Sequence, residues 1–316
     1  MDIICSATFF GRKHVYKMKY VMMNGQLTET TKAAIPVMDH GFLYGMGLFE
    51  TFRTYGGKPS LLSRHLQRLS QGCEELGIPF REEEHRLEML IHELLEANGL
   101  SDGYIRYTVS AGEEILGLPS ADYRKPSHLL FAKELPPLDE DWYIKGKPLQ
   151  LLRTTRNTPE GEIRYKSLHY MNNILAKREL MQYKLAVQSQ AEGLMLTKQG
   201  HLAEGIVSNL FFITKGVLYT PDLSAGILPG ITREVVLEAA DDLGIPTIKG
   251  LFSTQHLSQA DEIFMTSSIQ ELIPITALLG FPEGEVIQVQ NSQMGPNTRR
   301  LLDLYRKKAG RKDVET

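Results

Sequence analysis

The stretch G-I-L-P-G-I-T-R-E-V-V-L-E-A-A-D-D-L, residues 226–243, decides how the second half of the chain folds. Its apolar residues recur every three to four positions and would share one face of a helix: Val235, Val236, Ala239, Ala240 and Leu243. Gly244 and then Pro246 follow directly, which is typical of a helix C-terminus. The stretch therefore predicts a helix over residues 231–243.

The start of this predicted helix has the chemistry of a phosphate site. Gly230 lets the backbone approach a ligand closely, and Ile231 and Thr232 would be the first helical residues. Free N–H groups and the positive end of the helix dipole attract an anion there, and the Thr232 hydroxyl adds a further donor. A plain helix N-terminus is the alternative, and this segment alone does not choose between the two.

A run of hydroxyl groups lies further along the chain. Thr266, Ser267 and Ser268 come directly after a strand predicted at 261–265. These hydroxyls could bind the same phosphate, or they could cap the next turn.

A lysine and a carboxylate in the same half complete a set of three elements. Lys166 lies at the mouth of a helix predicted from Leu168, and Glu204 lies 204 − 166 = 38 residues later, before the apolar strand 210–213. A cofactor with a phosphate, an aldehyde and a pyridine ring needs a lysine for a Schiff base, a carboxylate that keeps the pyridine nitrogen protonated, and phosphate donors. Surface placement is the default for any single lysine or glutamate, so only the conjunction favours a cofactor site.

Strands and helices are mixed in both halves of the chain, which predicts a two-domain α/β or α+β fold. Strands are expected at 48–55, 104–110, 128–134, 149–153, 193–197, 207–214, 217–220, 247–252, 261–266 and 284–289, and further helices at 62–76, 83–97 and 297–308. The segment from Glu134 to Asp141 is acidic and contains two consecutive prolines, which favours a linker. We expect an N-terminal extension at 1–19, a small domain at 20–133, a linker at 134–147 and a large domain at 148–316.

The composition excludes several classes of protein. Of 316 residues, 42% are hydrophobic and 23% charged, unlike disordered, collagen-like or coiled-coil chains. A net charge of -3 gives no basic field for nucleic acid. Cys5 and Cys73 are too few for a disulfide scaffold or a cysteine-rich zinc site, and no apolar run of about 18 residues predicts a membrane span. We therefore expect a soluble, cytoplasmic enzyme without a metal site.

Residues 1–17 differ from the rest of the chain. A short apolar patch precedes the basic residues Arg12, Lys13 and Lys17, which is the reverse of the order in a signal peptide. We expect Met18 to be the natural start and residues 1–17 to be a disordered or artefactual extension.

The glycine-rich segment 39–47 has part of a dinucleotide-binding fingerprint. Gly45 and Gly47 fit its spacing, but the third glycine is absent and a strand follows where a helix is required. We therefore reject a nicotinamide-dependent dehydrogenase and expect a tight loop in this segment.

The order of motifs along the chain resembles the fold-type IV pyridoxal-phosphate enzymes. The motifs are D-H-G-F-L-Y-G-x-G-x-F-E (39–50), H-x-x-R-L (65–69), R-x-K-S (164–167), E-G-x-x-S-N (204–209) and G-x-L-x-G-I-T-R (226–233), and the resemblance spans about residues 20–305. This family contains branched-chain aminotransferases, D-amino-acid aminotransferases and aminodeoxychorismate lyases, and segment 156–173 looks most like the lyases. The resemblance implies a small N-terminal domain, a larger barrel-like domain and pyridoxal 5'-phosphate as cofactor.

The resemblance also implies roles for single residues. Lys166 is the catalytic lysine that forms the Schiff base and carries the proton, and Glu204 is the partner of the pyridine nitrogen. Further cofactor-binding residues lie in the matched motifs: Arg68, Ile231, Thr232 and Ser268 at the phosphate, Leu228 at the ring, and Ser208, Asn209 and Ser267. Spacing alone misses Arg68, because a predicted helix favours a solvated charge there. Arg106 is a candidate for binding a substrate carboxylate, although its strand could point it inward or outward, and a surface arginine in an ion pair is the alternative. Weaker candidates of the same kind are His40, Tyr44 and Arg164.

Two departures from the transaminase patterns favour a lyase reaction. D-amino-acid aminotransferases carry an arginine where this chain has Ala111 and a tyrosine where it has Phe49. The resemblance then implies conversion of 4-amino-4-deoxychorismate, a small dicarboxylate, into 4-aminobenzoate and pyruvate. An aminotransferase acting on D-amino or branched-chain amino acids is the alternative, and a cofactor-free binding protein is the hypothesis from another class. The resemblance also implies a homodimer and leaves open a link to the upstream aminodeoxychorismate synthase.

Overall fold

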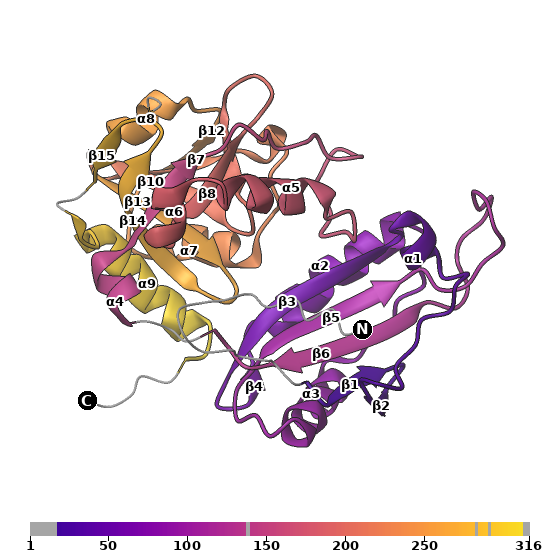
Figure 1. The fold of residues 1–316 in the computed structure, drawn as a ribbon. Helices are drawn as coiled ribbons and strands as arrows, with labels where there is room; N and C mark the ends of the chain where they lie inside the picture. The colour runs from indigo at the N-terminus through magenta and orange to yellow at the C-terminus, as the bar shows by residue number, and fades with distance from the viewer. Residues whose placement is uncertain (1–17, 137–139, 282–283, 290–291, 312–316) are drawn as a thin grey trace.

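Two β-sheets, one in each half of the chain, organise the protein (Figure 1). The computed structural model describes residues 18–136, 140–281, 284–289 and 292–311. The predicted extension 1–17 lies outside the described residues. Met18 and Lys19, which we also assigned to the extension, are bonded to the fold: the Lys19 N–H donates to Asn98 Oδ1 at 2.9 Å, and the Met18 carbonyl accepts from the Thr30 hydroxyl.

The first sheet is antiparallel throughout, with the strand order β2-β1-β6-β5-β3-β4. Its strands are β1 (Tyr20–Met23), β2 (Gln26–Glu29), β3 (Gly47–Tyr55), β4 (Lys58–Pro59), β5 (Tyr104–Ser110) and β6 (Ser127–Lys133). Helices α2 (Leu62–Glu75) and α3 (Glu84–Ala97) pack on one face, and the short α1 (His40–Tyr44) precedes β3.

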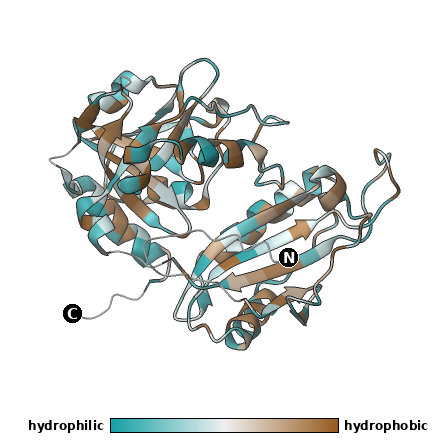
Figure 2. Cartoon of the chain, viewed as in Figure 1, coloured by the Kyte–Doolittle hydropathy of each residue, from teal (hydrophilic) through white to brown (hydrophobic). Residues whose placement is uncertain are grey.

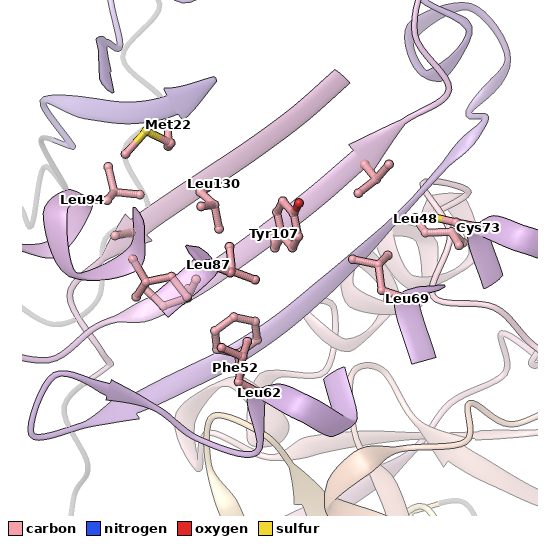
Figure 3. Packing of buried hydrophobic residues seen from close by; sticks show 14 of the residues in the cluster. Met22, Leu48, Phe52, Leu62, Leu69, Cys73, Leu87, Leu94, Tyr107 and Leu130 are labelled. Atoms are coloured by element: carbon pink, nitrogen blue, oxygen red, sulfur yellow. The ribbon is translucent and has the colours of Figure 1, made fainter. Parts of the chain in front are cut away.

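Alternation along the strands builds the core of this half. Phe52 in β3 and Tyr107 in β5 point to the helices, where they meet Leu69 of α2 and Leu87 of α3 (Figure 3). All four side chains are at most 2% exposed. Burial of each such side chain contributes about 1.5–3 kcal/mol to the free energy of unfolding. Because successive side chains of a strand point to opposite faces, the other face of β3 is free to contact the second half of the chain.

The second sheet is mixed and curls on itself. Its path is β12-β11-β10-β13-β14-β7-β8-β9, with β15 paired to β14. The strands are β7 (Lys147–Leu151), β8 (Glu192–Leu196), β9 (Leu202–Gly205), β10 (Asn209–Thr214), β11 (Val217–Pro221), β12 (Thr247–Gly250), β13 (Glu262–Ser267), β14 (Glu271–Leu279) and β15 (Val286–Gln288). The Leu202 N–H donates to the Phe252 carbonyl at 2.7 Å, so the two ends of the path meet and the sheet is barrel-like.

Helices cover the outside of this curled sheet, and hydrophobic segments alternate with hydrophilic ones along both layers (Figure 2). They are α4 (Glu140–Lys145), α5 (Met171–Leu180), α6 (Lys184–Gln188), α7 (Ile231–Asp242), α8 (Thr254–Ser258) and α9 (Pro296–Lys308), with a 3-10 turn η1 (Leu223–Ala225). Val236 of α7 and Leu301 of α9 pack on Phe264 of β13. No helix within the described ranges is long and apolar enough to cross a membrane.

The predicted mixed α/β fold is confirmed, although several elements differ from expectation. The helix expected from Leu168 begins at Met171, because the residues before it pair with β3. Neither β9 nor the nine-residue β14 was predicted, α1 lies in the expected loop 39–47, and α4 lies inside the expected linker 134–147. The domain boundaries themselves stay a prediction.

The outward face of β3 binds the second half of the chain. Arg53 Nη1 donates to the Ile269 carbonyl at 3.0 Å, and the Tyr55 hydroxyl donates to Glu271 at 2.6 Å. Glu271 is fully buried and also accepts from Arg306 Nε at 2.7 Å and Arg311 Nη1 at 3.3 Å. One carboxylate therefore joins β3, β14 and the C-terminal helix.

Replacing Glu271 with alanine is expected to lower the free energy of unfolding by about 3–5 kcal/mol, because it leaves the buried Arg53 and the half-buried Arg306 and Arg311 without their counter-ion. Burial alone would raise the pKa of Glu271, but the charge of Arg306 and the Tyr55 hydrogen bond lower it. The stabilisation is therefore present above the unfolded pKa of about 4.3 and is lost as the pH falls through the folded value.

Urea unfolding of Glu271→Ala at several pH values checks this prediction. The difference in the free energy of unfolding between the wild type and Glu271→Ala should be large at pH 7 and smaller in acid. Glu29→Ala, which removes only the exposed ion pair with Lys32, is the control and should unfold like the wild type. Equal stability of the two variants at pH 7 would contradict the role of Glu271.

Candidate active site

Lys166 is held between the two halves of the chain. The Phe49 N–H donates to the Lys166 carbonyl at 2.9 Å, and the Leu168 N–H donates to the Gly47 carbonyl at 3.0 Å. These bonds add segment 166–168 to the edge of β3 as an antiparallel bridge. The lysine therefore lies on extended chain, not at the mouth of a helix as its sequence context suggested.

The environment of Lys166 weakens its basicity. Its side chain is half-buried, and Nζ lies 4.8 Å from the centroid of the Phe49 ring. Burial and the charge of Arg68 lower the pKa of Lys166 to about 8, although Glu50 and Glu204 act in the opposite direction. An amine with this pKa is available as a nucleophile or base near neutral pH.

A cavity of about 630 Å³ opens beside the lysine. It lies between β3 and α2 on one side and segment 163–166 with the start of α7 on the other. Its charged and apolar walls include Phe49, Glu50, Arg68, Arg164, Lys166 and Ile231. A space of this size accommodates a cofactor-sized molecule, and its cations favour an anionic one.

Arg68 reaches across the cavity from α2 to α7. Nε and Nη2 donate to the two carboxylate oxygens of Glu50 at 2.8 and 2.6 Å, and Nη1 donates to the Pro229 carbonyl at 2.7 Å. The side chain is only 15% exposed, so it is not the solvated charge that helical spacing alone suggested. Glu50 lies on the same face of β3 as Leu48 and Phe52, the face that points to the core. A carboxylate buried at this position needs a cation as its partner.

The start of α7 lies next to Arg68 and has no side-chain cap. Gly230 is the N-cap residue, and no side chain accepts from the first helical N–H groups. Thr232 is 2% exposed, and its hydroxyl lies 3.4 Å from that of Ser268. The structure thus brings Ile231, Thr232 and Ser268 together at the uncapped N-terminus of a helix of twelve residues.

The other hydroxyls of this region have different surroundings. Thr266 and Ser267 are the last residues of β13 and do not follow it, which corrects the predicted strand end. Ser267 Oγ accepts from the Gln270 N–H at 3.1 Å and so caps the turn. Among the described residues, Ser208 and Thr266 are buried with hydroxyls that lack a hydrogen-bond partner.

Glu204 precedes the apolar strand β10 as predicted, but it lies within β9, a strand that was not predicted, and three donors hold its carboxylate. Oε1 accepts from Arg156 Nε at 2.7 Å, and Oε2 accepts from Asn209 Nδ2 at 3.1 Å and from the Leu228 N–H at 3.0 Å. Asn209 also donates to the Leu228 carbonyl at 2.9 Å. Arg156 was not predicted as a site residue, and its positive charge compensates the buried charge of Glu204.

Arg106 lies on the face of β5 that points away from α2 and α3. Its Cζ is 3.6 Å from the centroid of the Phe49 ring, and Nε donates to the Thr108 hydroxyl at 3.2 Å. Burial lowers the pKa of Arg106, which carries no ion pair among the described contacts. Because the Phe49 ring also contacts Lys166, Arg106 lies close to the lysine, and one ring interacts with both cations.

The remaining substrate candidates are occupied by other contacts. His40 is fully buried and bonds to the Tyr123 hydroxyl at 3.1 Å and to the Ile115 carbonyl at 2.9 Å. The Tyr44 hydroxyl accepts from the Gly117 N–H. Arg164 donates to the Gly226 carbonyl at 2.6 Å and to the Asn157 carbonyl, and burial together with Arg156 lowers its pKa to about 10. Only Arg164 of these three lines the cavity.

Within the described part of the chain, no three histidine, cysteine, aspartate or glutamate side chains are grouped so that they could hold a metal ion. Two carboxylates act on the charge of Lys166, Glu50 at the cavity and Glu204 on β9, and each is bonded to an arginine. The chemistry of the site therefore lies with an amine, several cations and two paired carboxylates.

Comparison with known proteins places this geometry in context. The model of the family described as amino-transferase class IV matches residues 47–278. The aminodeoxychorismate lyase of Bacillus subtilis (strain 168) is 39% identical over 289 residues, which cover 91% of this chain and 94% of that protein. The crystal structure of 4-amino-4-deoxychorismate lyase from Pseudomonas aeruginosa is 31% identical with a TM-score of 0.77, covering 94% of this chain and 100% of that one. A branched-chain amino acid aminotransferase of T.th. with pyridoxamine 5'-phosphate is 28% identical with a TM-score of 0.79, covering 94% and 96%.

Proposed function

Because the chain belongs to the amino-transferase class IV family, we propose that it is a pyridoxal-phosphate enzyme that converts 4-amino-4-deoxychorismate into 4-aminobenzoate and pyruvate. The lyases of Bacillus subtilis and Pseudomonas aeruginosa, similar over nearly their whole lengths, support this reaction. One structural observation carries the proposal. A lysine with a pKa lowered to about 8 borders a cavity that also holds Arg68 and the start of an uncapped helix.

The residues present fit the cofactor. The uncapped start of α7 and Arg68 supply donors for a phosphate, with Thr232 and Ser268 beside them. Two buried hydroxyls without a partner flank Asn209, since Ser208 precedes it and Thr266 pairs with it across the sheet. Unpaired buried hydroxyls of this kind support a bound group that completes the site.

Each side chain then has a chemical task. The cofactor supplies an aldehyde that condenses with amines and a ring that withdraws electrons from the attached carbon. Lys166 would hold the aldehyde and then move the proton from the carbon that bears the substrate amine. Glu204 would keep the pyridine nitrogen protonated, and Leu228 and Asn209 hold that carboxylate in place. Arg106 would bind a substrate carboxylate, to which Arg164 adds positive charge.

The choice of a lyase over a transaminase rests on what surrounds the lysine. Phe49 has no hydroxyl with which to hold an amino-acid carboxylate, and its ring instead contacts the guanidinium of Arg106. Ala111 is fully buried and carries no charge. The carboxylate-binding capacity beside Lys166 therefore comes from Arg106, which supports an anionic substrate.

The purified protein supplied with pyridoxal phosphate is expected to release 4-aminobenzoate from 4-amino-4-deoxychorismate without any added keto acid. The reason is that the lyase reaction would leave the cofactor in its starting form. Chromatography of 4-aminobenzoate and an enzymatic assay for pyruvate measure the two products, which should appear in equal amounts. D-alanine or L-leucine with 2-oxoglutarate is the control and should give no transamination above background. A requirement for 2-oxoglutarate would instead support the aminotransferase alternative.

The homodimer, the cytoplasmic location and the link to the synthase that supplies the substrate are further parts of the proposal. Exposed apolar side chains gather around α1 and the loop that contacts it, with Phe42 at 71%, Leu116 at 72% and Leu118 at 89%. Such a patch supports an interface with a second copy of the chain. Sedimentation should give twice the mass of 35.7 kDa.

A further inference from the structure

Glu50 occupies one whole edge of the Arg68 guanidinium. Its two oxygens accept from Nε and Nη2 at 2.8 and 2.6 Å, which is a bidentate pair. Nη1 is bound separately, to the Pro229 carbonyl at 2.7 Å. Three anchoring bonds fix both the position and the plane of this guanidinium.

The anchoring leaves a defined part of Arg68 free. A guanidinium has five N–H donors, and three of them are used, so one N–H remains on each of Nη1 and Nη2. Pro229 directly precedes Gly230, the N-cap residue of α7, so the free donors lie at the uncapped helix start. Two fixed N–H groups beside a helix N-terminus match the oxygens of a phosphate monoester.

Glu50 is itself held in its ionised form. Burial alone would raise its pKa, but the charge of Arg68 and the hydrogen bonds from Arg68 and His65 lower it to about 2. His65 Nδ1 lies 2.6 Å from Glu50 Oε2, and His65 Nε2 is buried without a partner. Burial lowers the pKa of His65, so its neutral ring donates to the carboxylate at neutral pH.

We propose that Glu50 is a positioning residue, which acts through Arg68 to hold a phosphate-binding fork against the start of α7. This inference rests on the proposed cofactor and assigns a specific group of it, the phosphate, to the Glu50–Arg68 pair. In this role Glu50 would contact neither the phosphate nor the reacting atoms. Its negative charge would by itself repel a phosphate, so its contribution is the orientation of Arg68.

The test compares two ligands that differ only in the phosphate. Pyridoxal phosphate and pyridoxal are titrated separately into the full chain freed of cofactor, and their dissociation constants are measured by absorbance. Glu50→Gln removes the charge, and Glu50→Asp keeps the charge but withdraws the carboxylate from Arg68. Both variants are expected to raise the dissociation constant of pyridoxal phosphate by about 10–100-fold and that of pyridoxal by less than about twofold.

Glu238→Gln is the matched control. Glu238 on α7 forms a bidentate pair with Arg64 on α2 at 2.6 and 2.9 Å, one helical turn from Arg68 and across the same two helices. This variant should leave both dissociation constants unchanged, because it loosens the helix contact without moving Arg68. In an Arg68→Ala background, Glu50→Gln should cause no further loss of pyridoxal phosphate binding.

The outcomes separate the possible roles. Equal weakening of both ligands in the Glu50 variants would mean a general structural role and would overturn the proposal. Unchanged binding of pyridoxal phosphate would also overturn it. If the wild-type chain bound neither ligand, the proposed function itself would fail, and the Glu50 variants would not be needed to show it.

Discussion

Replacing Lys166 with alanine is expected to reduce the release of 4-aminobenzoate by about 10²–10⁴-fold from the lost proton transfer alone. No other lysine contacts the Phe49 ring among the described contacts, so no neighbouring amine takes its place. Loss of the covalent link to the cofactor adds to the defect. Steady-state rates at saturating pyridoxal phosphate measure the effect.

The control for Lys166→Ala is Lys177→Ala, which removes an exposed lysine from α5 and should leave the rate unchanged. Added methylamine should restore part of the lost rate, because a small amine can enter the space left by the side chain and accept the proton. A Lys166→Ala variant that retains the wild-type rate would contradict the assignment, and so would an equal loss in Lys177→Ala.

The pH dependence of the reactivity of the Lys166 amine tests the same assignment in a second way. With a pKa of about 8, roughly a fifth of the Lys166 amine is neutral at pH 7.4, against about 0.1% for an ordinary lysine. Reaction of the cofactor-free chain with an aldehyde should therefore be fast at neutral pH and rise through pH 8. Since burial and Arg68 cause the shift, Arg68→Ala should move this midpoint upward.

The local pattern of the sequence was sufficient to predict the helices of ten or more residues and most strands, but not the short helices α1, α4, α6 and α8. The stripe of α7 and the alternation of β3 each appear in a single stretch and agree with the structure within two residues. The missed strand β14 contains nine buried residues, E-L-I-P-I-T-A-L-L, with a proline and no alternation. Its neighbours β13 and β7 cover both edges and helices cover its outer face, so nothing in the sequence marks one side as exposed.

The order of motifs pointed to Lys166 and to the start of α7 as candidate parts of the site, but not to the residues that support them. Arg68 and Glu50 are 18 positions apart and form a pair only because α2 packs back on β3. Arg156 lies 48 positions before Glu204, and only the curl of the second sheet brings the two together. Such pairs depend on long-range packing, which propensity and spacing do not encode.

Replacing Glu204 with glutamine is expected to lower the rate of 4-aminobenzoate release by about 10²–10³-fold, the size of effect seen when one preorganised charge is removed from an active site. The carboxylate accepts from Asn209 and Leu228 on one oxygen and from Arg156 on the other. A glutamine keeps its oxygen toward the first two and turns its NH₂ group toward the Arg156 donor. The anion that would hold the pyridine nitrogen protonated is then absent.

The absorbance spectrum of the bound cofactor distinguishes this effect from a loss of structure. Protonation of the pyridine nitrogen should weaken in Glu204→Gln, so the spectrum should change with pH where that of the wild type does not. Glu262→Gln is the matched control, because Glu262 is equally buried but accepts from Asn297 and Thr298 at the start of α9. That variant should lower the melting temperature and leave the spectrum and the rate per folded molecule unchanged. A normal spectrum and rate in Glu204→Gln would show that the carboxylate serves only to neutralise Arg156.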